Sequence, residues 1–234
     1  MNGKIALMLE EALLQEQKEK GDRERSGKMN PSSFGQCYLR QFRHRRNDKQ
    51  SDPPSMDTLK MFFAGNIIER IVTDKVSKEF QQIVVEEEDI KGVIDFAVEG
   101  DDEICEVKSI NSWLFKKKLP AEDDIDGLFN VVPQYVFQST YYALKKNKSL
   151  VRLIFVSKSL DRLEIKEYVF EAEKFKDRVE EEIKINREWW AKQELPEPKP
   201  RLYDLKEGQY CQFRTTCLDN GWDCVNMKNV SKPF

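Results

Sequence analysis

The order of apolar and polar positions divides the chain into helical and extended segments. Residues 5–17 and 56–80 repeat apolar side chains at the spacing of an α-helix, and neither stretch contains proline. The polar stretch 18–30 between them is expected to be a loop or a frayed end. The second helix should begin at Ser55 or Asp57, after Pro53 and Pro54. Its apolar stripe predicts burial on one side, through Leu59, Phe62, Phe63, Ile67, Ile71 and Val76.

The pattern changes to strict alternation after this helix. Residues 82–87, 92–99 and 103–110 are predicted to be short strands, the last two joined by a turn at 100–102. A helix follows at 134–145, a strand pair at 150–158 and 161–170, and a charged helix at 173–193. The proline-rich stretch 194–200 predicts a stiff linker. We expect three parts: 1–55 with the first helix and cysteine, a core at 56–193, and a strap with further cysteines at 194–234.

The hairpin at 92–110 places charged side chains inside apolar strands. Alternation puts Glu106 and Lys108 on one face of their strand. A turn at Gly100 and Asp101 would set Asp95 opposite Glu106, with Cβ atoms about 5 Å apart. Carboxylates at this spacing repel each other unless something neutralises them.

A divalent cation is one answer to this repulsion. Asp95 and Glu106, with the backbone carbonyl of Val107, suit Mg²⁺ or Mn²⁺, which prefer oxygen ligands. Lys108 would then position or help to deprotonate an attacking water and offset negative charge on a phosphate. The alternative is an exposed hairpin whose acids face water.

The composition fits a soluble globular protein. Apolar residues make up 39% of the 234 positions and charged residues 35%, and no apolar run approaches the roughly 20 residues of a bilayer span. No secretion leader is recognisable, so we expect a cytoplasmic protein without membrane contact. The net charge of −3 means that nucleic-acid contacts would need local basic clusters. Two such clusters, otherwise interpretable as solvated faces, are Arg40, Arg43, His44, Arg45 and Arg46, and Lys116, Lys117 and Lys118.

These residues resemble the PD-(D/E)xK nuclease superfamily, in the RecB-like branch that includes CRISPR adaptation exonucleases and related phage nucleases. Ile94-Asp95-Phe96 resembles the first acidic motif and Glu106-Val107-Lys108 the ExK motif. The resemblance spans most of the chain. It implies a restriction-endonuclease-like α/β fold, with a central mixed sheet flanked by helices and the N-terminal and cysteine-bearing segments joined at one side.

Two further motifs flank the hairpin. Gln138 and Tyr142 stand at the QxxxY positions of the family's downstream helix, and with Gln134 they recur every four residues on one face. That face could line a substrate groove, and a polar surface stripe is the alternative. Upstream, Gly65 precedes Glu69 at the spacing of the family's G-x-x-x-H segment, so the resemblance implies a third carboxylate ligand in place of histidine.

The cysteines have a layout of their own. In iron-sulfur members of the branch one cysteine precedes the core and three follow it, and Cys37, Cys211, Cys217 and Cys224 fit that order. Gly208 stands where one of the family's cysteines is expected. Four thiolates could hold a [4Fe-4S] cluster or a Zn²⁺ ion, and unligated cysteines are the alternative. Cys105 is expected to be a small core residue.

Together these features predict a metal-dependent DNA nuclease, an exonuclease that acts on single strands or free ends with a metal-activated water. Asp95, Glu106, Glu69 and Val107 would hold the metal, Lys108 would act in the chemistry, and Gln138 and Tyr142 would position the strand or the water. Tyr38, Phe42 and Trp113 could stack on bases. The alternatives are a non-catalytic nucleic-acid-binding module and an accessory subunit that works with CRISPR or phage recombination and replication proteins.

Overall fold

The computed structural model describes residues 4–22, 26–76, 81–97, 100–158, 164–197 and 211–222. Within these ranges, the helices and strands follow in this order: α1 (Lys4–Asp22), η1 (Pro31–Ser33), α2 (Tyr38–Arg46), α3 (Met56–Val76), β1 (Gln81–Glu86), β2 (Lys91–Ala97), β3 (Glu103–Ile110), α4 (Ser112–Lys117), α5 (Ile125–Val131), α6 (Pro133–Lys145), β4 (Leu150–Ser157), β5 (Ile165–Glu171), η2 (Ala172–Phe175), α7 (Lys176–Lys192) and α8 (Arg214–Asp219). None of the helices in these described ranges has the length and apolar character needed to cross a membrane.

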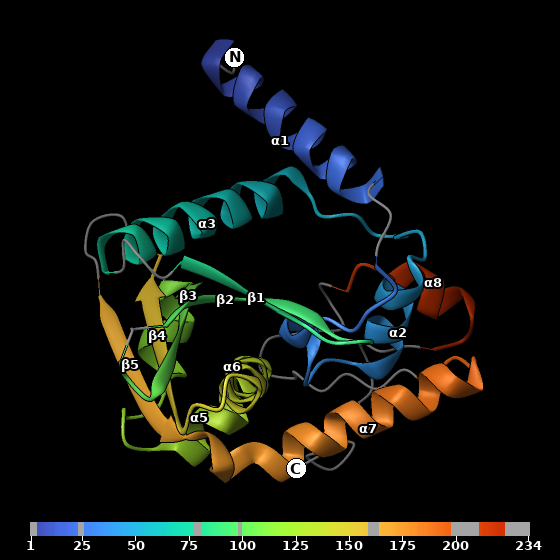
Figure 1. The fold of residues 1–234 in the computed structure, drawn as a ribbon. Coiled ribbons are helices and arrows are strands. Elements are labelled where there is room, and N and C mark those ends of the chain that lie inside the picture. The colour runs from blue at the N-terminus through green and yellow to red at the C-terminus, as the bar shows by residue number, and fades with distance from the viewer. Residues whose placement is uncertain are drawn as a thin grey trace.

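Five strands form one mixed sheet in the order β1-β2-β3-β4-β5 (Figure 1). Strands β3 and β4 run parallel, whereas the other neighbouring pairs are antiparallel. Parallel neighbours need a long crossover, and helices α4, α5 and α6 provide it. Strands β3 and β4 are buried along most of their length because helices cover both faces of the sheet. The expected α/β fold with a central mixed sheet flanked by helices is confirmed.

The two faces of the sheet are covered by different helices. Helix α6 begins at Pro133, whose fixed φ suits the first helical position, and its apolar side chains join the main core with Ile104 and Leu153. On the other face, Ile68 and Val72 of α3 pack against Val107 and its neighbours. Helix α7 packs beside α6 and also contacts α2.

The β2–β3 hairpin has the register that the sequence predicts. Phe96 pairs with Cys105 and Ala97 with Ile104, so the same register continued places Asp95 opposite Glu106. Gly100 has a φ of +84°, a value that suits glycine because it has no Cβ. The ladder ends after these two pairs, and the strands separate beyond Phe96.

The apolar stripe of α3 is not buried, which corrects one expectation. Phe62, Phe63, Ile67 and Ile71 are all exposed, and only Leu59 among the described members of the stripe is buried. The sheet lies instead against the other face of α3, where Gly65 allows close approach. The first helix also continues to Asp22, through residues that the sequence pattern suggested were a loop.

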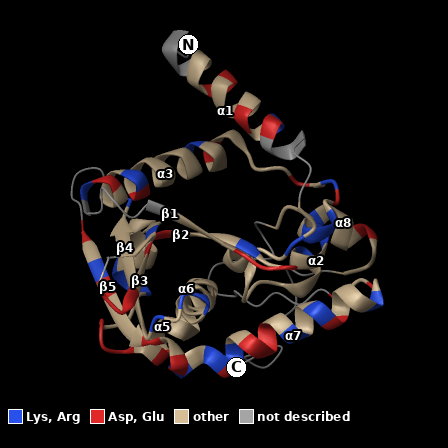
Figure 2. Cartoon of the chain, viewed as in Figure 1, with Lys and Arg blue, Asp and Glu red and all other residues tan. Residues whose placement is uncertain are grey.

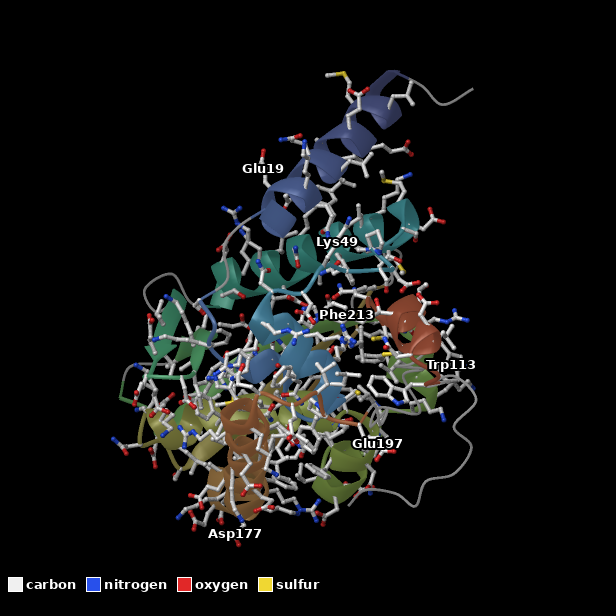
Figure 3. All side chains as sticks on the ribbon, turned by 90° about the vertical axis from the view of Figure 1, so that its right-hand side faces the viewer. Glu19, Lys49, Trp113, Asp177, Glu197 and Phe213 are labelled. Carbon is white, nitrogen blue, oxygen red and sulfur yellow. The ribbon has the colours of Figure 1, made fainter. Side chains whose placement is uncertain are left out.

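The segment after Cys37 packs against the segment that ends in α8. The carboxylate of Asp52 accepts hydrogen bonds from the backbone and the hydroxyl of Thr215, each at 2.7 Å. Phe213 lies edge-on to the ring of His44, with ring centroids 5.0 Å apart (Figure 3). Two chain segments far apart in sequence are therefore joined at one side of the sheet, as the sequence predicts.

Candidate active site

The candidate site lies where β2 and β3 separate. Asp95, just beyond the last paired residues, accepts a hydrogen bond from the backbone N–H of Val107 through Oδ2 at 2.8 Å. The Asp95 side chain thus accepts the hydrogen bond that the backbone of a paired strand would otherwise accept from Val107 of β3. The separation brings a carboxylate between two strands that are otherwise apolar.

Glu106 is the most deeply buried carboxylate of the site, with 1% of its surface exposed. Its Oε1 accepts hydrogen bonds from Lys108 Nζ at 2.5 Å and from Gln138 Nε2 at 2.6 Å. Its Oε2 is also buried, and no donor in the described part of the chain reaches it. A buried carboxylate oxygen without a donor costs about 1–3 kcal/mol or more. The site therefore has an unsatisfied position for a cation or a donor.

Glu69 reaches the site from α3. Its Oε1 accepts hydrogen bonds from the backbone N–H of Ser109 at 2.8 Å and from the Ser109 hydroxyl at 2.7 Å. Gly65, one turn earlier, allows this approach, because a Cβ there would lie 2.8 Å from Ser109 Oγ and from Lys158 Nζ. Neither Ser109 nor Lys158 was identified from the sequence. Ser109 follows the ExK residues directly, and Lys158 carries no pattern that would single it out.

The charges of the site influence one another. Burial raises the pKa of Asp95, and Glu69 adds to this effect while the Lys108 ammonium opposes it. Burial also raises the pKa of Glu106 to about 8, against the opposing effect of Lys108 and with a contribution from Asp95. For Lys108, burial lowers the pKa, but Glu106, Asp95 and Glu69 outweigh it and hold the pKa above its ordinary value. The Lys108 ammonium therefore interacts with all three carboxylates, and the Lys158 ammonium interacts with one of them, Glu69.

These residues fit a divalent cation in part. No three Asp, Glu, His or Cys side chains within the described ranges come together as a ready ligand set. However, Glu106 Oε2 lacks a donor, and the oxygen donors are of the hard type that Mg²⁺ and Mn²⁺ prefer. Asp95 and Glu69 each keep one oxygen in a hydrogen bond to a backbone N–H of β3.

Gln138 and Tyr142 are buried, so the alternative of a polar surface stripe does not hold for this face of α6. Gln138 connects the helix to Glu106, as described above. The Tyr142 hydroxyl accepts a hydrogen bond from the backbone N–H of Val93 at 3.1 Å. Gly92 makes room for this ring, because a Cβ at Gly92 would lie 2.9 Å from Tyr142 Cε1. Gln134 is buried as well and lies one turn before Gln138.

A cavity of about 720 Å³ lies beside this helix face. Gln138 and Tyr142 form part of its wall, so it reaches the residue that contacts Glu106. The lining contains no Asp or Glu but includes five basic side chains, six amides and three aromatic rings. They are Lys28, Arg40, His44, Arg45 and Lys91; Asn30, Gln36, Gln41, Gln138, Asn186 and Gln212; and Phe42, Tyr142 and Trp190. Lys28 and Lys91 both pair with Glu86, so Arg40, His44 and Arg45 of α2 are the basic side chains of this lining that favour an anion.

Helix α2 supplies most of the cationic wall, and its ribbon is largely blue in Figure 2. The guanidinium of Arg45 lies over the Trp190 ring at 4.1 Å from the centroid, and its Nε donates to the carbonyl of Gly27 at 2.6 Å. Arg43 and Arg46 do not line the cavity, and both pair with Asp48. The basic cluster recognised in the sequence therefore has two parts: Arg40, His44 and Arg45 line the cavity, and Arg43 and Arg46 pair with Asp48.

The aromatic residues proposed for base stacking have different surroundings. Tyr38 donates its hydroxyl to Glu182, and the Phe42 ring is buried against Trp190. Trp113 alone of the three is exposed, on α4, with Lys118 Nζ 5.6 Å from its ring centroid. Of these three, Trp113 therefore has the exposed ring that stacking on a base requires.

Glu182 of α7 holds the cavity wall in place and was not identified from the sequence. It is 2% exposed, and its carboxylate accepts hydrogen bonds at 3.0 Å from the Gly35 backbone N–H, the Gln41 amide and the Tyr38 hydroxyl. A buried carboxylate with this many donors anchors α2 to α7. In the sequence Glu182 is one of several acids in the same helix, and nothing distinguishes it from its neighbours.

The cysteines are only partly brought together. Cys37 and Cys217 lie in one small apolar cluster with Leu39 and Trp222, whereas Cys211 is half-buried at the turn before α8. Cys224 lies outside the described residues. Cys105 is buried behind the ExK strand, and burial raises the pKa of its thiol to about 12, as suits a core residue.

Comparisons with known proteins support the fold. No protein-family model and no curated protein matches the sequence. The crystal structure of SSO0001 aligns with 93% of this chain and 98% of its own, with a TM-score of 0.55 and 14% identity. An alkaline exonuclease from Laribacter hongkongensis, LHK-Exo, aligns with 75% of this chain and all of its own, with a TM-score of 0.40 and 16% identity. The first similarity shows a shared fold, and we draw no functional conclusion from either.

Proposed function

We propose that the chain is a metal-dependent DNA nuclease that hydrolyses phosphodiester bonds, acting as an exonuclease on single strands or free ends. The observation that carries this proposal is the buried Glu106, one oxygen of which accepts a hydrogen bond from Lys108, while no donor among the described residues reaches the other. Asp95 and Glu69 lie near enough to raise the pKa of a neighbouring carboxyl. Such a cluster is costly for stability alone, which favours a role in chemistry.

Each residue of the site has a separate proposed role. Asp95, Glu106, Glu69 and the Val107 carbonyl would hold Mg²⁺ or Mn²⁺, which would supply positive charge and lower the pKa of a bound water. Lys108 would position the attacking water and donate to the phosphate oxygens as negative charge develops. Gln138 fixes the orientation of Glu106 through its amide. Tyr142 holds β2, and so Asp95, in place through Val93.

The cavity beside α6 is the proposed path of the substrate strand. Its basic side chains would contact phosphates, and its amides would contact bases. An unpaired strand is the proposed substrate because the Watson–Crick edges of its bases are open to hydrogen bonds from amides. The exposed Trp113 provides a stacking position beyond the ExK strand.

End-labelled DNA tests the proposal. Single-stranded and duplex oligonucleotides, labelled at either end, are incubated with anaerobically purified protein and Mn²⁺ or Mg²⁺, or with EDTA. We expect cleavage only with metal, and its loss in Asp95→Asn. The matched control Asp126→Asn changes an exposed acid on α5 and should retain activity. An inactive wild type that still binds DNA would overturn the nuclease and favour a non-catalytic binding or accessory subunit, which the acid-free cavity also supports.

A second metal site is proposed at the cysteines. Cys37 and Cys217 already lie in the same group of packed apolar side chains. Together with Cys211 and Cys224 they would provide four thiolates for a [4Fe-4S] cluster or a Zn²⁺ ion. Such a centre would fasten segment 1–55 and segment 194–234 onto a nuclease core at 56–193. Metal analysis and visible absorption of anaerobically purified protein distinguish iron from zinc. A protein with neither metal, whose thermal stability does not change in Cys217→Ser, would overturn the site.

A further inference from the structure

Exposed apolar side chains are concentrated on two helices. Of the 16 large apolar residues that are exposed in the described part of the chain, nine lie on α1 and α3. The middle of α3 carries no charge, as its tan ribbon in Figure 2 shows. The nine are Leu7, Met8, Leu9, Leu14, Met61, Phe62, Phe63, Ile67 and Ile71, hereafter the α1–α3 face.

Helix α3 has more apolar surface than its own chain covers. Ile68 and Val72 pack on the sheet. Phe63, Ile67 and Ile71 lie on a different side of the helix at helical spacing, the pattern of a buried stripe, and Ile71 is 55% exposed. A stripe of this kind is expected to have a partner, and α1 packs beside it.

Helix α1 makes few packing contacts with the body of the protein. Leu13 is buried and Glu10 pairs with Lys60 at 2.5 Å, but Met8 and Leu14 are each 54% exposed. The helix projects beyond the body next to α3 in both views (Figures 1 and 3). A helix of 19 residues that rests on one other helix is marginal in water, because most helical stability in proteins comes from packing.

A hollow of about 270 Å³ lies between these two helices. Its walls are mainly apolar, from Leu13, Leu59, Phe62, Phe63 and Ile67, and the polar groups Glu16, Gln17, Asn66 and Arg70 complete the lining. The chain thus carries a projecting apolar helix and an apolar hollow side by side. This is the arrangement that a two-fold symmetric interface needs, because each copy must supply both halves.

We propose that the α1–α3 face is the interface of a homodimer, in which α1 of one copy packs against α1 and the hollow of the other. The nine side chains point to several sides of the two helices, and Phe62, Phe63 and Ile67 are the ones that line the hollow, so they form the receiving surface for the second copy. A second copy is favoured over another partner because the projecting and the receiving parts occur on the same chain. The proposal is independent of the nuclease, since Glu69 turns towards β3.

Sedimentation velocity over a wide concentration range tests the dimer with the full-length protein. We compare wild type with Leu14→Glu on α1 and Ile71→Glu on α3. Both positions are exposed in the single chain, so a charge there should leave the fold intact, which circular dichroism checks. The matched control is Ile165→Glu, an exposed apolar position on β5. We expect a wild-type dimer whose dissociation constant rises on the order of tenfold or more in each α1–α3 variant and is unchanged in the control.

Three results would overturn the proposal. The wild type could remain monomeric at all concentrations, the control could weaken the dimer as much as the α1–α3 variants, or the assembly could grow with concentration beyond two copies. The variant on α3 keeps the test decisive if Leu14→Glu loses helix content, because α3 is anchored independently on the sheet.

Discussion

Replacing Glu106 with glutamine in the metal-free protein tests whether this carboxyl is buried as described. The pKa of Glu106 is raised from 4.5 to about 8, mainly by burial. The unfolded chain releases this proton near pH 4.5, whereas the folded protein keeps it up to about pH 8. Between these values the folded state binds more protons, so the free energy of unfolding falls as the pH rises, by at most about 1.4 kcal/mol per pH unit.

Over the whole window this loss amounts to roughly 3–5 kcal/mol, and above about pH 8 it stops growing. Glu106→Gln removes the titrating group. The effect of the Lys108 charge on the ionisation of Glu106 is already contained in the raised pKa, so it does not have to be added separately. We therefore expect the variant to gain stability relative to wild type as the pH rises.

Urea unfolding in EDTA, followed by tryptophan fluorescence between about pH 5 and pH 9, measures this difference. Glu181→Gln, an exposed acid on α7, is the control and should follow the wild-type profile. If the free energies of unfolding of Glu106→Gln and wild type differ by a constant amount throughout, the raised pKa of Glu106 is refuted.

Three further outcomes follow from the contacts around the site. Gly92→Ala should lower the unfolding free energy by about 1–3 kcal/mol, because the Tyr142 ring fills the space of the new methyl group, and an unchanged melting temperature would contradict this. Glu182→Ala should cost about 2–4 kcal/mol in denaturant unfolding, whereas Glu181→Ala on the same helix should cost almost nothing. Arg45→Ala should weaken single-stranded DNA binding by fluorescence anisotropy and reduce the salt dependence by about one ion, whereas equal effects in Arg46→Ala would contradict the cavity as the binding surface.

Much of the fold could be predicted because the core strands carry clear patterns. The hairpin register followed from alternation and from Gly100, and α6 from its apolar periodicity and Pro133. The short helices α2, α4, α5 and α8 were not predicted. They have six to nine residues each, so propensity and periodicity are weak over their length, and tertiary contacts decide their conformation.

The candidate site was predictable only where residues are close in sequence. Glu106 and Lys108 share one strand, so alternation alone places them together. Glu182 and Ser109 act through partners that are 147 and 40 positions away, and no local pattern shows such a pairing. The stripe on α3 misled for a different reason. Apolar side chains at this spacing are usually buried, but the described part of this chain provides no surface that covers them.

The single-turnover rate of DNA cleavage in Lys108→Met, at saturating Mn²⁺, tests the central claim most directly. Lys108 is assigned to the chemistry and not to the metal, so the variant should bind Mn²⁺ and DNA while its rate falls on the order of a hundredfold or more. Lys184→Met, which changes an exposed lysine on α7 that pairs with Glu181, should keep the wild-type rate. Cleavage by Lys108→Met at the wild-type rate, or cleavage by wild type in EDTA, would contradict the proposed metal-dependent nuclease.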